Sequence, residues 1–319
     1  MSLRINLIFP GLIFLLLLSV GNGCALHPPG RVLVPRPTAT PAGHQPVLVS
    51  VPLPTATPAR PQPAASPPSS EGIGSAPSPT PTQLPVLVFL DPGHGGVDTG
   101  TIGTTEARTA VDEKDIALAI ALRTAAHLRH DGIGVALSRT DDTLPGLTPA
   151  DLTSDGTALT PEGVLADLQR RIDRANASGA RVLLSIHLEG FAYPSVRGAE
   201  TFYDSSRPFS ARRHRFAELV QSDLIRSLRA QGYATPDRCV TDDLDLVTDG
   251  FGTLGANYNH LVLLGPGVPG RLRPSTMPDA LSEPLFLTDP AEATAATQPA
   301  MQELIATAYA QAIEQFLRP

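Results

Sequence analysis

Two histidines and one glutamate stand at the borders of segments that the sequence predicts to be buried or helical. His94 follows the apolar run 86–90 in a glycine-rich loop, and His187 directly follows the apolar run 181–186. Glu113 opens a stretch with helical periodicity. Two imidazoles and one carboxylate form the three-ligand set of a catalytic zinc site, whose fourth position holds water. These residue types therefore indicate hydrolysis assisted by one Zn²⁺ ion.

Each of the three residues also has an ordinary explanation in a folded domain. A histidine in a glycine-rich loop is often only a loop residue, and His187 could be a core residue with satisfied hydrogen bonds. Glu113 could simply favour the dipole of the helix that it opens. Spacing alone leaves both explanations open, so the elements that position the three side chains decide between them.

Strands and helices alternate from Pro85 onward. Short apolar runs predict strands, and amphipathic stretches predict helices. The strands are expected at 86–90, 134–139, 181–186, 198–203, 260–264 and 280–282, and the helices at 112–128, 165–177, 210–231 and 299–317. This order predicts a single α/β domain with a mostly parallel or mixed twisted sheet covered by helices on both faces. Sites in such sheets form at the carboxyl ends of strands, where both histidines stand.

The first 24 residues have the pattern of an export signal. Arg4 precedes an apolar core at 12–18, which is shorter than the roughly 20 residues needed to span a bilayer. Small residues then lead to Cys24, as in bacterial lipoprotein signals, where this cysteine is acylated and becomes the mature N-terminus. Gly21 stands where that motif usually has leucine, so cleavage without lipid and an uncleaved anchor are the alternatives. If Cys24 carries lipid, Cys239 is expected to be an unpaired thiol.

Residues 25–84 differ in composition from the rest of the chain. About half of the 33 prolines precede Pro85, among many Ser, Thr and Ala residues. Such a segment cannot bury enough apolar surface to offset its ordering entropy, so a disordered spacer is expected. Wherever it forms polyproline II, it would hold the domain at 85–319 away from a membrane at about 3 Å per residue.

The charge and the cysteine count exclude two classes of protein. The formal net charge of −7 provides no basic face for phosphates, so nucleic acid is not expected as a partner. The chain has two cysteines, which are too few for a disulfide scaffold.

An ordered set of motifs over roughly residues 85–317 resembles the zinc-dependent N-acetylmuramoyl-L-alanine amidases of the amidase 3 type. The motifs are Asp91-Pro92-Gly93-His94-Gly95-Gly96 with Asp98 and Gly100, Glu113-Lys114, Arg139-Thr140, Arg171 with Asn176, Ser185-Ile186-His187, and Gly198 with Glu200 and Tyr203. Each motif is weak alone, and the ordered set is specific. The resemblance implies that His94, Glu113 and His187 are the zinc ligands. It also implies that Glu283, in the stretch 281–290, is the catalytic acid/base. Glu189, beside His187, is the alternative if Glu283 does not have this role.

Several features depart from the pattern of that family. The loop 101–112 is long and offers Glu106 and Asp112 as rival carboxylates, although only Glu113 precedes Lys114 at a helix start. His187 is followed by Leu188 and Glu189, where the family usually has a small residue and Asn or Asp. The insertion 242–273 is unusual. If the stretch 264–267 within it were the last strand, the catalytic glutamate would be missing.

The resemblance implies hydrolysis of the amide between N-acetylmuramic acid and L-alanine in peptidoglycan. Zinc would polarise the carbonyl, and Glu283 would carry a proton from water to the leaving amine. The rivals are a catalytically inactive amidase fold that binds peptidoglycan or regulates another hydrolase, and a zinc peptidase that cuts the stem peptide. The expected location is the cell envelope, periplasmic or extracellular. The expected partners are peptidoglycan and, through lipid on Cys24, a membrane, and the chain is expected to be a monomer.

Overall fold

The computed structural model describes residues 85–245, 254 and 258–318. The predicted signal at 1–24, with Cys24, and the predicted spacer at 25–84 lie outside the described residues. Within the described part of the chain, no helix is both long and apolar enough to cross a membrane.

Six strands form one sheet in the order β4-β1-β5-β8-β6-β7. Their bounds are β1 Val86–Pro92, β4 Gly134–Leu137, β5 Val182–Ile186, β6 Ala199–Tyr203, β7 Asp237–Asp242 and β8 Asp279–Glu283. β4, β1, β5 and β8 are parallel to one another, whereas β6 is antiparallel to β8 and parallel to β7. The predicted α/β fold with a mixed, mostly parallel sheet is confirmed. The carboxyl ends of β1, β5 and β8 therefore share one edge of the sheet, and those of β6 and β7 lie at the opposite edge.

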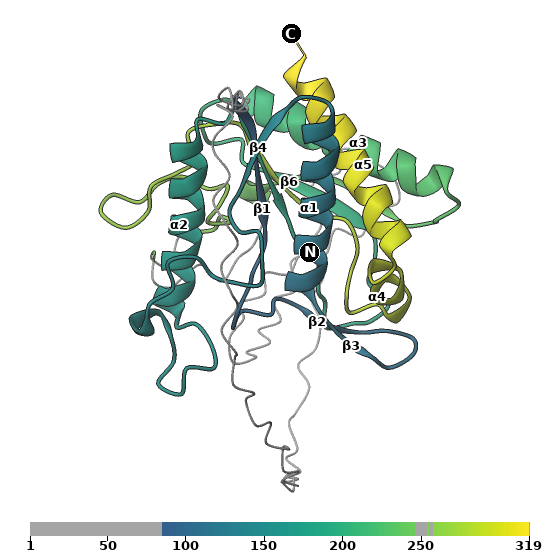
Figure 1. Ribbon diagram of the computed structural model, residues 1–319, viewed down its shortest axis with the longest axis horizontal. Coiled ribbons are helices and arrows are strands. Elements are labelled where there is room, and N and C mark those ends of the chain that lie inside the picture. The colour runs from purple at the N-terminus through teal and green to yellow at the C-terminus, as the bar shows by residue number, and fades with distance from the viewer. Residues whose placement is uncertain (1–84, 246–253, 255–257, 319) are drawn as a thin grey trace, which may run out of the picture. The chain divides into compact units, whose positions relative to one another are not determined.

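Helices cover both faces of the sheet (Figure 1). The helices α1 Glu113–His130, α3 Ser210–Ala230 and α5 Pro299–Leu317 pack on one face, and α2 Pro161–Ser178 packs on the other. Along β1, Val88 and Leu90 face the first group, whereas Phe89 faces α2. Both faces of β1 and β5 are buried, which explains why the sequences of these two strands are mostly apolar. A short helix, α4 Pro290–Ala296, and the 3-10 turns η1 Pro149–Asp151 and η2 Asp243–Asp245 complete the helical elements described.

A small hairpin fixes the start of α1. It consists of β2 Ile102–Thr104 and β3 Ala110–Asp112, which pair antiparallel within the long loop after β1. The backbone N–H of Glu113 donates to the carbonyl of Thr101 at 3.0 Å, and that of Lys114 donates to the carbonyl of Thr99 at 3.1 Å. The loop thus returns to the sheet edge where β1 ends, and it delivers Glu113 there.

Two predictions for the segment after α3 are wrong. The strand predicted at 260–264 is a turn, in which Leu264 and Gly265 both donate to the carbonyl of Leu261. Val262 and Leu263 pack beside Leu165 and Ile172 of α2, so their apolar character reflects burial rather than strand pairing. The strand lies earlier instead, at β7. Cys239 in β7 is not the unpaired thiol that was expected, because no cysteine in the described part of the chain is free.

Candidate metal centre

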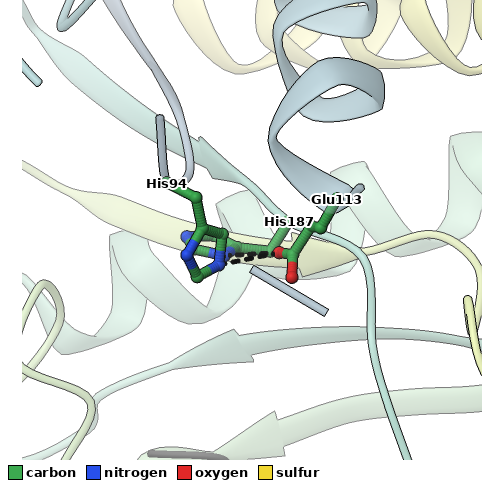
Figure 2. A group of neighbouring side chains, drawn as sticks. All are labelled: His94, Glu113 and His187. Carbon is green, nitrogen blue, oxygen red and sulfur yellow. Dashed lines mark hydrogen bonds and ion pairs between the residues drawn. The ribbon is translucent and has the colours of Figure 1, made fainter. Parts of the chain in front are cut away.

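His94, Glu113 and His187 converge at the carboxyl ends of β1 and β5 (Figure 2). His94 lies in the loop after β1, His187 follows β5, and Glu113 is the first residue of α1. β1 and β5 are neighbouring parallel strands, so their ends bring the two histidines together. The structure therefore places the three predicted ligands side by side.

The donor atoms of this group fit a single metal ion. Glu113 Oε1 lies 3.0 Å from His94 Nε2 and 2.9 Å from His187 Nδ1, and the two nitrogens are 3.2 Å apart. Tetrahedral zinc with bonds of about 2.0–2.1 Å separates its ligand atoms by roughly 3.3 Å. Two imidazoles and one carboxylate at these separations are the donor set of catalytic zinc sites, which leave one position open.

The protonation states of His94, Glu113 and His187 depend strongly on one another. Burial lowers the pKa of His94, but the carboxylates of Glu113 and Asp98 outweigh burial and raise that pKa to about 10. Burial raises the pKa of Glu113, but His94 and His187 outweigh it and hold the pKa well below the ordinary value. Metal binding to such a group must displace protons from the imidazoles, so it is coupled to pH.

Outer contacts orient the donor atoms. His94 Nδ1 lies 2.9 Å from Asp98 Oδ2, which turns Nε2 toward Glu113. The backbone N–H of Leu188 donates to Glu113 Oε1 at 3.0 Å, and that of Thr101 donates to Glu113 Oε2 at 2.7 Å. Contacts of this kind fix the tautomer and direction of metal ligands, and their loss weakens metal binding.

Two buried arginines hold the backbone of the loop that carries His94. Arg171 donates to Asp91 Oδ1 at 2.9 Å and to the carbonyl of His94 at 2.6 Å. Arg139 donates to the carbonyls of Pro92, at 3.1 Å, and Gly93, at 2.8 Å. His94 itself has φ of 60°, a left-handed conformation that costs about 1–3 kcal/mol unless its surroundings enforce it. Both arginines belong to the motifs that carry the family resemblance, and the sequence alone assigned them no role.

Two glycines allow the ligands to approach so closely. A Cβ atom at Gly93 would overlap the imidazole of His187. At Gly100, with φ of +69°, a Cβ atom would lie 2.6 Å from Glu113 Oε2 and 2.7 Å from His94 Cδ2. Any larger residue at either position must displace a ligand.

Glu283 ends β8, the strand that neighbours β5, so it lies at the same edge as His187. The backbone N–H of His187 donates to the carbonyl of Ser282 at 3.0 Å. Within the described part of the chain, the buried Oε2 atom of Glu283 has no hydrogen-bond partner. Burial raises the pKa of Glu283 well above the ordinary value, and the charges of Glu189 and Glu113 raise it further. This carboxyl group therefore holds a proton more readily than an ordinary glutamate.

Two further carboxyl groups, those of Glu189 and Glu200, lie near Glu283. Burial raises the pKa of Glu189 to about 8, although its Oε1 atom accepts a hydrogen bond from Gly190 at 2.9 Å. Glu200 lies opposite Glu283 in the β6–β8 register and pairs with Arg238 at 2.9 Å. The position of Glu189, two residues after His187, made it the alternative acid/base from sequence, whereas the sequence assigned Glu200 no catalytic role.

The rival carboxylates of the long loop lie elsewhere. Glu106 is exposed, and its backbone N–H donates to Thr294 Oγ1 of α4 at 2.9 Å. Asp112 is half-buried at the N-cap of α1 and does not belong to the group formed with the two histidines. The stretch 264–267, considered as a last strand without its glutamate, lies outside the sheet.

Comparisons with known proteins agree with this geometry. A sequence profile described as N-acetylmuramoyl-L-alanine amidase, of the amidase 3 type, matches residues 88–315. The germination-specific N-acetylmuramoyl-L-alanine amidase of Bacillus subtilis is 30% identical over 230 residues, which cover 71% of this chain and 79% of that protein. The amidase AmiA of Salmonella typhimurium is 31% identical over 256 residues, which cover 75% of this chain and 78% of that protein.

Solved structures share the fold. An N-acetylmuramoyl-L-alanine amidase from Clostridium difficile superposes with a TM-score of 0.51 at 28% identity, covering 73% of this chain and 97% of that chain. The CwlD amidase of Clostridioides difficile, solved in complex with the GerS lipoprotein, gives a TM-score of 0.53 at 24% identity, covering 73% of this chain and 98% of that chain. With the profile match spanning most of the chain, the protein belongs to the N-acetylmuramoyl-L-alanine amidase family of the amidase 3 type.

Proposed function

We propose that this amidase cleaves the amide between N-acetylmuramic acid and L-alanine in peptidoglycan with one zinc ion held by His94, Glu113 and His187. Glu283 is the acid/base. The observation that carries the proposal is the convergence of three donor atoms within 2.9–3.2 Å of one another at the edge where Glu283 ends its strand. The family match supports the substrate, and the donor set supports the metal.

When bound, zinc supplies Lewis acidity, which polarises a carbonyl and makes a water molecule more acidic near neutral pH. Glu283 accepts the proton of the attacking water at its carboxylate and donates it to the leaving amine of L-alanine. Its raised pKa suits both steps, because the group must be able to take up the proton and then release it. Arg139 and Arg171 keep His94 in its left-handed conformation throughout.

Mass spectrometry of digested peptidoglycan tests this reaction against its rivals. The amidase releases intact stem peptides that begin with a free L-alanine amine and leaves glycan strands without peptide. Peptides cut within the stem would instead identify a zinc peptidase. Binding of the folded, zinc-loaded protein to peptidoglycan without any release would identify an inactive module.

We also propose that residues 1–24 export the chain to the cell envelope, that residues 25–84 are a spacer, and that residues 85–319 act as a monomeric catalytic domain. Lipid on Cys24 would tether it to a membrane. Cys239 is not free in the structure, and Cys24 is the only other cysteine of the chain. Lipid on Cys24 and a disulfide between Cys24 and Cys239 therefore exclude each other. A Cys24→Ser variant should leave the membrane fraction. If it stays there through detergent-free washing, or if the mature protein carries a Cys24–Cys239 disulfide, the lipid proposal fails.

A further inference from the structure

A second group of metal-ligating side chains lies at the opposite edge of the sheet from the first. Asp204 follows β6, Asp243 follows β7, and His260 belongs to the turn after them. One potential ligand atom from each lies within 4.8 Å of the others. Because β6 and β7 run against β5 and β8, this group is separated from His187 and Glu283 by the length of the strands.

The group combines ion-pair distances with hydrogen-bonding directions that are not satisfied. His260 Nδ1 lies 2.9 Å from Asp204 Oδ2 and 3.4 Å from Asp243 Oδ2. Despite the short distance, neither His260 Nδ1 nor Asp204 Oδ2 has a hydrogen-bond partner within the described residues, and both atoms are buried. The side chain of Asp204 has 0% exposure. The two atoms are close enough for a hydrogen bond, but the angle between them is unsuitable. Such an arrangement is expected when two ligand atoms point toward a shared metal position rather than toward each other.

Other donors already hold the two carboxylates in place. Asp204 Oδ1 accepts hydrogen bonds from the backbone N–H of Ser206 at 2.7 Å and from its hydroxyl at 2.6 Å. Asp243 accepts from the backbone N–H of Leu261 at 2.9 and 3.0 Å. Hydrogen bonds of this kind orient metal ligands, and among the described residues the buried Oδ2 atom of Asp204 accepts no hydrogen bond.

The arginines next to this group are already engaged. Arg213 pairs with Asp279 Oδ1 at 2.9 Å, and Arg207 donates to the carbonyl of Leu264 at 2.5 Å. Both Asp204 and Asp243 have fully buried side chains, and buried carboxylates are costly unless cations compensate them. His260 faces both carboxylates, so its single positive charge, when protonated, offsets only one of their two negative charges.

We propose that Asp204, Asp243 and His260 bind a second divalent transition-metal ion of the zinc class. The imidazole disfavours Ca²⁺ and Mg²⁺, which take oxygen ligands, whereas Zn²⁺ accepts imidazole and carboxylate together. The three ligands come from three separate segments, so the ion fastens the turn at 258–264 to the ends of β6 and β7. Its role is structural, because it lies away from the catalytic edge.

Zinc stoichiometry of the whole purified chain tests this proposal, with metal measured by plasma mass spectrometry after gel filtration in zinc. We expect a His94→Ala/His187→Ala variant, which lacks the first site, to retain one equivalent of zinc. Adding His260→Ala to that variant should remove it, and adding Asp243→Asn should weaken binding at least about tenfold, since loss of outer contacts alone costs 10–100-fold. His214→Ala, which removes an exposed histidine of α3, is the matched control and should change nothing.

A second measurement does not depend on whether the His260 variant folds. The variant that lacks the first site keeps Asp204, Asp243 and His260 unchanged. Added Zn²⁺ should therefore raise its melting temperature, and the rise should grow with the Zn²⁺ concentration. Absence of both bound zinc and a melting shift in that folded variant would overturn the proposal and identify a metal-free cluster of ionic side chains. Failure of the amidase reaction would leave this result unaffected, because the two sites are measured separately.

Discussion

Glu283 and Glu189 are two half-buried carboxyl groups near the candidate metal centre, and their surroundings differ. Glu189 Oε1 accepts a hydrogen bond from the backbone of Gly190, whereas Glu283 Oε2 has no partner among the described residues. A proton carrier must be free to exchange its proton with water and substrate. Glu283 therefore suits the role better, and Glu189 is the candidate if this assignment fails.

We expect Glu283→Gln to lower turnover by about 100-fold or more, the usual scale for the loss of a general acid or base. The amide keeps the shape of the side chain, so zinc content and melting temperature should stay close to those of the parent. Glu189→Gln is the matched control and should retain much more activity. Hydrolysis of a soluble muramyl peptide measures both variants. Near-parental turnover of Glu283→Gln would reject its role, and a collapse of Glu189→Gln would transfer that role to Glu189.

Asp98 is the residue that orients His94 through Nδ1. Asp98→Asn replaces the charged acceptor with an amide, so we expect zinc affinity to fall by about 10–100-fold. Competition with a chromophoric chelator measures this directly. Asp142→Asn serves as the control, because Asp142 contacts Gly96 and Lys114 in the same region without touching His94. Equal affinities for the two variants would contradict the orienting role.

At the scale of elements, Arg171 joins α2 to the loop after β1. Its guanidinium contacts Asp91, Asp167 and the carbonyl of His94, and its side chain is only 5% exposed. A lysine cannot reproduce this fork of donors. We expect Arg171→Lys to cost at least one hydrogen bond to a charged group, about 1.5–3 kcal/mol of unfolding free energy.

Arg170→Lys is the matched control on the same helix. Arg170 is 26% exposed, and its ion pair is with Asp151 at 3.2 Å, so its replacement should cost about 1 kcal/mol or less. Urea unfolding of both variants measures the difference. If the two variants were equally stable, the loop would not depend on Arg171.

The elements that carry the first site could be predicted from sequence because their signals are local. β1 and β5 are mostly apolar, a histidine follows each of them within two residues, and Glu113 begins a periodic helix. The sequence did not predict β7, because β7 is polar. It is the outermost strand of the sheet, so its residues are only half-buried. The turn at 260–264 was mistaken for a strand because burial against α2 needs the same residue types as strand pairing.

The second group of ligands was missed for a related reason. Asp204 and Asp243 stand in polar stretches, and His260 lies in a short apolar run, so no local pattern links them. Their proximity arises from the reversal of β6 and β7 within the sheet, which depends on long-range pairing. The outer contacts of Glu113, from Thr101 and Leu188, depend in the same way on how the hairpin folds back.

At the scale of the whole molecule, the four residues of the proposed catalytic site lie at or just beyond the ends of elements that belong to one sheet and its helices. The family match begins at residue 88 and ends at 315, and α5 packs along α1 and α3 to close the domain. We therefore expect residues 85–319 to fold and to hydrolyse a soluble muramyl peptide with the same kcat/KM as the full chain.

Residues 85–319 and the full chain must be compared on two substrates. A spacer changes which substrate the catalytic domain can reach, but it does not change the rate of the chemical step. On soluble muramyl peptide the two chains should be equal, since the hydrogen bonds that hold His94 and Glu113 come from residues after 85. On peptidoglycan beside a membrane, only the tethered full chain would profit from a raised local concentration of substrate. Circular dichroism and zinc content establish that the shorter chain is folded and loaded. If that chain is folded and loaded but slower on the soluble substrate, residues before 85 contribute to the site, and the proposed division of the chain is wrong.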